Sequence, residues 1–155
     1  MPGRATRFGR SAFATALYGA LIVAGWGFVS LLGDSDVTAD DSIGPLVVPV
    51  AVVVSAVGVF IALASPRWSA VAARGVAPLF GWAAVLGLGA VAIYLACLGV
   101  LQFVATGRLT AALLVVAVQA PTPYTLVVIG SGLLAALGLG LVQGSTGRPS
   151  WPWEE

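Results

Sequence analysis

The stretch Pro45–Ala64, PLVVPVAVVVSAVGVFIALA, contains no charged side chain over 20 residues. A helix rises about 1.5 Å per residue, so about 20 apolar residues cross the roughly 30 Å hydrocarbon core of a bilayer. The whole chain is 59% hydrophobic and only 8% charged, whereas soluble domains carry about 25% charged residues. The stretch therefore predicts a membrane-spanning helix in a membrane protein.

Three further charge-free runs lie on either side of it: Ser11–Leu32, Pro78–Val104 and Tyr124–Val142. Each is long enough to span a bilayer, and Pro78–Val104 is long enough to tilt or to project beyond the membrane. The pattern predicts an all-α, polytopic membrane protein with four transmembrane helices in one membrane domain, residues 1–155. The spans are expected at about 11–32, 45–64, 78–104 and 124–142, with a loop over Ser65–Pro78.

The first run has a competing interpretation as a cleaved signal peptide. Arginines precede it, and the residues Val37-Thr38-Ala39 before Asp40 loosely match a cleavage site. The apolar run is 22 residues long, however, and a signal peptide usually has about 7–15 apolar residues. We expect an uncleaved span, and whether it is ever cleaved stays open at this stage.

A shorter apolar segment, Leu109–Val118, lies between the third and fourth spans. It is about half the length needed to cross a bilayer. It is compatible with an interfacial helix, a re-entrant segment or an extension of a neighbouring span. Pro121 and Pro123 disfavour one continuous helix into the fourth span. We favour a short extra helix near 109–119, packed at the membrane surface.

The arginines predict the orientation. With four spans, six of the seven basic residues share one side of the membrane: Arg4, Arg7, Arg10, Arg67, Arg74 and Arg148. Only Arg108 lies on the other side. The positive-inside rule then places the N and C termini on the cytoplasmic side of a bacterial plasma membrane. We expect Trp68, Trp151 and Trp153 to anchor the inner interface, and Trp26 and Tyr124 the outer one.

The segment Gly33–Pro45, GDSDVTADDSIGP, holds four of the six carboxylates: Asp34, Asp36, Asp40 and Asp41. If Asp34 began a calcium-binding loop, Ala39 would stand where the sharp turn needs Gly, and Pro45 where a bidentate Glu is needed. The segment fails as an EF-hand, and we expect no metal site. We interpret it as a solvated turn whose Asp40, Asp41 and Ser42 cap the second span.

Reactive groups are scarce in this chain. There is no histidine, one cysteine (Cys97) and one methionine (Met1), and no charged residue lies within a span. Haem ligation, thiol exchange, proton relays and nucleophilic catalysis therefore have no recognisable machinery. The net charge of +1 does not indicate nucleic-acid binding. We expect no catalytic residue, no cofactor and no enzyme activity.

Two series of small residues recur every four positions. Ala12, Ala16, Ala20 and Ala24 share a face of the first span, and Gly132, Ala136 and Gly140 share a face of the fourth. Small residues at this spacing let helix backbones approach closely within a membrane. The alternative is that a chain rich in alanine and glycine produces such patterns by chance. We interpret both faces as helix-packing or partner-binding surfaces.

The run Ala16–Pro49 resembles the first hairpin of small, uncharacterised four-span proteins from high-GC Gram-positive bacteria. The resemblance covers about a fifth of the chain and carries no catalytic motif. It implies topology and an actinobacterial source, and it implies no activity.

These observations predict a non-catalytic integral membrane protein that acts through helix packing, as an accessory or structural subunit of a membrane complex. Its expected partners are membrane lipid and other membrane-protein subunits. The alternative is a small homo-oligomeric transporter or channel for a neutral or hydrophobic solute.

Overall fold

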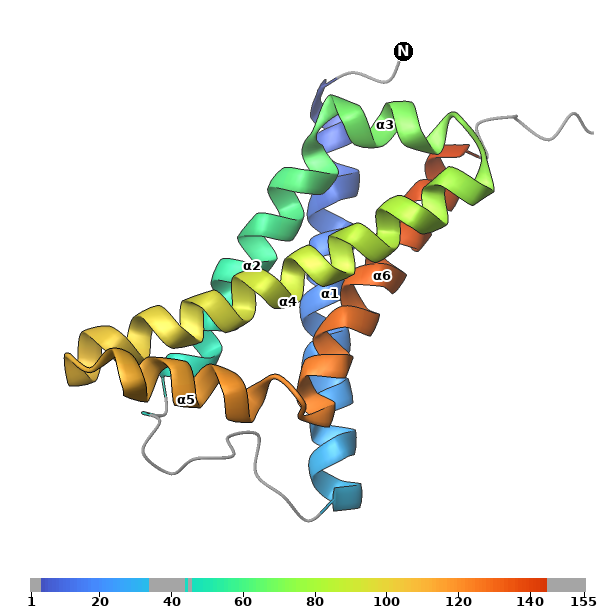
Figure 1. The fold of residues 1–155 in the computed structure, drawn as a ribbon. Coiled ribbons are helices and arrows are strands. Elements are labelled where there is room, and N and C mark those ends of the chain that lie inside the picture. The colour runs from blue at the N-terminus through green and yellow to red at the C-terminus, as the bar shows by residue number, and fades with distance from the viewer. Residues whose placement is uncertain (1–3, 34–43, 45, 145–155) are drawn as a thin grey trace, which may run out of the picture.

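Six helices and no strand make up the part of the chain that this computed structural model describes, residues 4–33, 44 and 46–144 (Figure 1). They are α1 Arg4–Gly33, α2 Val47–Ala64, α3 Pro66–Ala72, α4 Val76–Thr106, α5 Leu109–Gln119 and α6 Pro123–Gly144. Four helical segments are long and apolar enough to cross a membrane: Thr6–Gly33, Val47–Ala64, Val76–Thr106 and Pro123–Gln143. The predicted all-α architecture, with four spans and a shorter helix, is confirmed. The chain has the architecture of a multi-pass membrane protein.

The long helix α4 is the centre of the packing. It contacts α6, α2 and α5, while α1 packs against α6 and α2. Figure 1 shows α4 running diagonally past α1 and α6, with α5 beside its C-terminal half and α3 joining α2 to α4. Helices that are distant in sequence therefore enclose one apolar interior.

The segment between the second and third spans is partly helical, so the prediction of a loop over Ser65–Pro78 is wrong for its first half. Ser65 is extended (φ −68°, ψ 147°) and ends α2, as expected for a residue before proline. Pro66 then begins α3, because a proline suits the first helical turn. Gly75, with φ 110°, makes the turn into α4 that other residues rarely adopt.

The short helix α5 is separate from both neighbouring spans. Gly107 has φ 65°, and its N–H donates to the carbonyl of Phe103 at 2.7 Å, which ends α4 in a left-handed turn. The chain then reverses along α4, where a Cβ added at Gly99 would lie 3.1 Å from Val116 Cγ2. These contacts exclude the interpretation of residues 109–119 as an extension of a span.

Among the described residues, no side chain caps the start of α2. Leu46 occupies the N-cap position, and no side chain there accepts a hydrogen bond from the helix. The capping role predicted for Asp40, Asp41 and Ser42 lies outside the described residues, as does the rest of the acidic segment apart from Gly33 and Gly44.

The outer surfaces of the long helices are strongly apolar. Large side chains such as Phe13 and Leu31 are 74% and 85% exposed. Such exposure suits side chains that face lipid, because the hydrocarbon core is itself apolar. The buried residues include alanine and glycine, branched aliphatic side chains and several aromatic rings, and they set how the helices approach one another.

Candidate functional site

The small residues of α6 lie inside the chain. Gly132, Ala136 and Gly140 are all buried. A Cβ added at Gly132 would lie 3.1 Å from Gly87 Cα on α4. A Cβ added at Gly87 would lie 2.7 Å from the carbonyl oxygen of Ile129. Here two helix backbones touch, and only glycine leaves room for the contact.

The small residues of α1 lie on the outside. Ala12, Ala16, Ala20 and Ala24 are all exposed, as are Gly9 and Gly27 along the same helix. A Cβ added at Gly9 or Gly27 would meet nothing within 4 Å. We call the surface formed by Ala12, Ala16, Ala20 and Ala24 the α1 alanine face. No other described helix covers it.

The opposite side of α1 carries the groups that bind it to the rest of the chain. Tyr18 and Ile22 are fully buried, and Trp26 is 9% exposed. Their spacing of four residues is the signal in the sequence that identifies this inner face. This spacing could not be recognised as the inner face from the sequence, because apolar residues occur on every side of α1.

A hydrogen-bonded chain joins three helices. Tyr18 donates from its hydroxyl to Ser55 Oγ at 2.7 Å, and Ser55 donates to the carbonyl of Ala90 at 2.9 Å. Thr15, in contrast, donates to the carbonyl of Ser11 within its own helix. Hydroxyl groups in membrane spans often bond back in this local way. Ser55 instead ties α1 to α2 and α4, so its role is structural.

A second polar cluster lies where α1, α4 and the start of α6 meet. Trp26 donates from Nε1 to the carbonyl of Tyr124 at 3.0 Å, and the two rings pack edge to face. Gln119 Nε2 lies 3.5 Å from Tyr94 Oη, and Thr125 donates to the carbonyl of Gln119. Trp26 and Tyr124 are buried, so the prediction that they anchor the outer membrane interface is wrong. The indole N–H of Trp26 finds its acceptor inside the protein.

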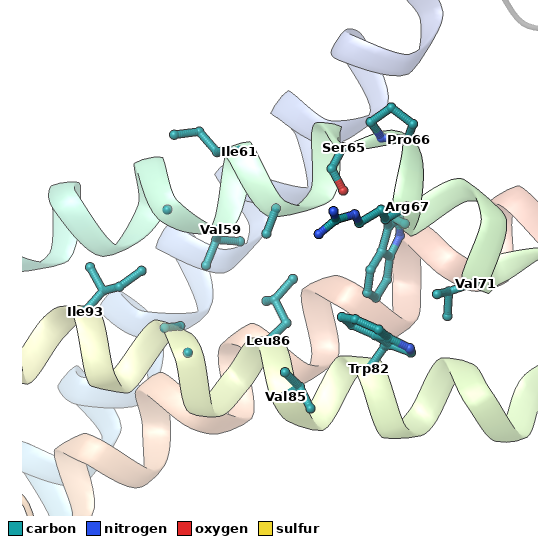
Figure 2. A pocket seen from close by; sticks show the side chains of 15 residues that line it. Val59, Ile61, Ser65, Pro66, Arg67, Val71, Trp82, Val85, Leu86 and Ile93 are labelled. Atoms are coloured by element: carbon teal, nitrogen blue, oxygen red, sulfur yellow. The ribbon is translucent and has the colours of Figure 1, made fainter.

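Sequence reasoning missed a groove of about 460 Å³ between the C-terminal half of α2, α3 and the N-terminal half of α4. We call it the α2–α4 groove. Figure 2 shows Val59 and Ile61 on its α2 side, Trp82 and Val85 on its α4 side, and Arg67 at the α3 end. Trp68 also lines the groove and is 4% exposed, so the prediction that it anchors the inner interface is wrong as well. The signal in the sequence was limited to Arg67 directly followed by Trp68.

No cluster of three or more His, Cys, Asp or Glu side chains capable of holding a metal ion occurs in the described part of the chain. Cys97 is half-buried in α4 and free of any disulfide. The candidate surfaces in the described part of the chain are the α1 alanine face and the α2–α4 groove.

Comparison with known proteins gives one match. The model of a family of unknown function, DUF6121, matches residues 5–155. Neither the comparison with curated proteins nor that with solved structures gives a match.

Proposed function

We propose that this chain, which belongs to the DUF6121 family, is a non-catalytic integral membrane protein that acts through helix contacts. Its role in this proposal is that of an accessory or structural subunit in a larger membrane complex. The observation that carries the proposal is the exposure of Ala12, Ala16, Ala20 and Ala24 on one face of α1.

The physical argument starts from the surrounding lipid. Large apolar side chains gain little by leaving lipid for a protein surface, because both environments are apolar. Small residues are different, since they let a second helix approach closely enough for van der Waals contact along its whole length. In α6 such residues serve the fold, whereas in α1 they remain available to a helix from another chain.

The partners in this proposal are membrane lipid and other membrane-protein subunits, with no nucleic acid. The chain would lie in the plasma membrane of a high-GC Gram-positive bacterium, with both termini in the cytoplasm. The arginine distribution supports this orientation. A reporter that is active only outside the cytoplasm should stay inactive when fused at Ser69.

The decisive experiment compares Ala20→Leu with Ala92→Leu. Both alanines are exposed within long helices, but only Ala20 belongs to the α1 alanine face. Full-length protein would be extracted from its native membranes in mild detergent, and the mass of the intact complex would be measured by native mass spectrometry. We expect a hetero-complex of defined stoichiometry that Ala20→Leu disrupts and Ala92→Leu preserves. If Ala20→Leu leaves the complex intact, the α1 alanine face is not the binding surface.

The alternative function is a small homo-oligomeric transporter or channel for a neutral or hydrophobic solute. The observation that favours it is the α2–α4 groove, whose lining is almost wholly apolar. In the same measurement, this function predicts a pure homo-oligomer with no second subunit. That result would replace the accessory role with the transport role.

A further inference from the structure

The α2–α4 groove is open toward the outer surface of the helices. Side chains that line it, including Ile61, Val85 and Trp82, are 65%, 58% and 48% exposed. Because α2 and α4 are both spans, this opening faces the surrounding lipid. Its volume of about 460 Å³ lies within the range of about 300–1,000 Å³ that is typical of ligand sites.

The groove has one charged end. Arg67 is the only charged side chain among the 15 residues that line it. Figure 2 shows the Arg67 side chain reaching back toward Ser65, above the apolar side chain of Leu86. All six acidic residues of the protein lie outside the described residues, and the described residues offer the guanidinium no anionic side chain. A planar guanidinium binds phosphate oxygens in a forked geometry.

A second polar group at the same end also lacks a partner. Trp68 lines the groove at 4% exposure, and its indole N–H donates to no acceptor among the described residues. A buried donor without an acceptor costs free energy. A headgroup rich in oxygen atoms, seated beside Arg67, would bring acceptors next to this donor.

We propose that the α2–α4 groove binds an anionic phospholipid, with its phosphate at Arg67 and one acyl chain along the apolar walls of α2 and α4. The charge pattern selects this occupant, since the groove is apolar along its length and cationic at one end. Basic pockets between transmembrane helices bind anionic headgroups in this way. The site includes no residue of α1, so lipid binding is independent of any partner on the α1 alanine face.

Gly89 offers a way to fill the groove without disturbing the fold. It lines the groove, and a Cβ added there would meet nothing within 4 Å. A leucine side chain at this position would fill the part of the groove where the acyl chain would bind. Leucine is also a better helix former than glycine, so the helix should be preserved. Gly81 is the matched control, because it lies in the same helix, has equally open space, and does not line the groove.

The test uses the purified full-length chain, delipidated and then mixed with equal amounts of phosphatidylglycerol and phosphatidylcholine that carry identical acyl chains. Native mass spectrometry counts the lipids retained. We expect the wild type to prefer phosphatidylglycerol, and Arg67→Gln to reduce that preference about fivefold, the effect of one basic residue near anionic lipid. Arg74→Gln, which alters an exposed arginine outside the groove, should behave as the wild type.

Gly89→Leu should lose retention of both lipids, while Gly81→Leu retains them, and thermal unfolding should show that both variants remain folded. Free glycerol phosphate should not displace the lipid. Equal retention of the two lipids by the wild type would overturn the proposal. The proposal would also be overturned if Arg67→Gln and Arg74→Gln reduced the preference for phosphatidylglycerol equally. Full lipid retention by Gly89→Leu, or displacement of the lipid by glycerol phosphate alone, would overturn it as well.

Discussion

The small-residue faces of α1 and α6 look alike in sequence but occupy opposite environments. Gly132, Ala136 and Gly140 are buried, whereas Ala12, Ala16, Ala20 and Ala24 are all exposed. On α4, Gly87 and Ala90 lie opposite Gly132, and the side chain of Leu79 lies against Gly140. A small-residue face packs inside the chain where a second small face lies opposite it. Without one, it remains on the surface.

The orientation of α1 is determined by its other side. Tyr18 and Trp26 have polar atoms that are bonded to α2 and α6. Turning the alanines inward would expose those polar groups to lipid, where unsatisfied polar atoms are costly. The comparison therefore shows that buried polar and aromatic contacts decide which face of a wholly apolar helix is the inner one.

The largest effect is expected from Gly132→Leu. The new side chain would push α6 away from α4 at the point where their backbones touch. Overpacking typically costs about 1–3 kcal/mol, and we expect the upper end of that range because the obstacle is backbone rather than a flexible side chain. Unfolding of the purified protein by titration with SDS measures the change.

The matched control is Gly130→Leu in the same helix, where an added Cβ meets nothing within 4 Å. This variant should unfold at the same SDS concentration as the wild type, or at a higher one, since leucine favours helix over glycine. Equal losses in the two variants would show that the close α4–α6 contact is not what makes the α6 face sensitive.

An intermediate effect on stability is expected from Ser55→Ala, which tests whether the Tyr18–Ser55 hydrogen bond fixes the side of α1 that faces inward. The change removes the acceptor of Tyr18 and the bond to Ala90. Hydrogen bonds between membrane helices contribute about 0.6 kcal/mol on average and at most about 1.7 kcal/mol, so we expect a loss of about 1 kcal/mol. The same SDS titration measures it.

Tyr18→Phe should cost less than Ser55→Ala, because Ser55 keeps its bond to the Ala90 carbonyl. In the double variant the two losses should not add, since both changes break the same Tyr18–Ser55 bond. Strict additivity would mean that the hydroxyl pair does not hold α1 in its orientation.

The smallest effect on stability is expected from Ala20→Leu. Ala20 is exposed, and substitutions at exposed positions usually change the free energy of unfolding by less than about 0.5 kcal/mol. The isolated chain should therefore unfold as the wild type does, even where the variant loses its partner. If Ala20→Leu lowered the free energy of unfolding as much as Gly132→Leu, the α1 alanine face would have to be packed inside the chain like the α6 face.

Several features of the fold could be predicted from short stretches of sequence. Pro121 and Pro123 correctly predict that α5 is separate from α6. Trp68 shows where such reasoning fails. It was predicted to anchor the inner membrane interface, yet it is buried against the α2–α4 groove, since α3 folds back over the end of the helices.

Which segments span the membrane is a local property. Hydrocarbon thickness sets the length, and the cost of buried charge sets the composition, so four charge-free runs were sufficient to identify four spans. Which side of each helix faces inward is not local in this way. Alanine, valine and leucine surround α1 on every side, and lipid accepts any of them. The inner face is determined only by contacts among residues that are distant in sequence, such as Tyr18 with Ser55 and Gly87 with Gly132. The same contacts leave the alanines of α1 outside. The groove at Arg67 likewise forms only where α2, α3 and α4 come together.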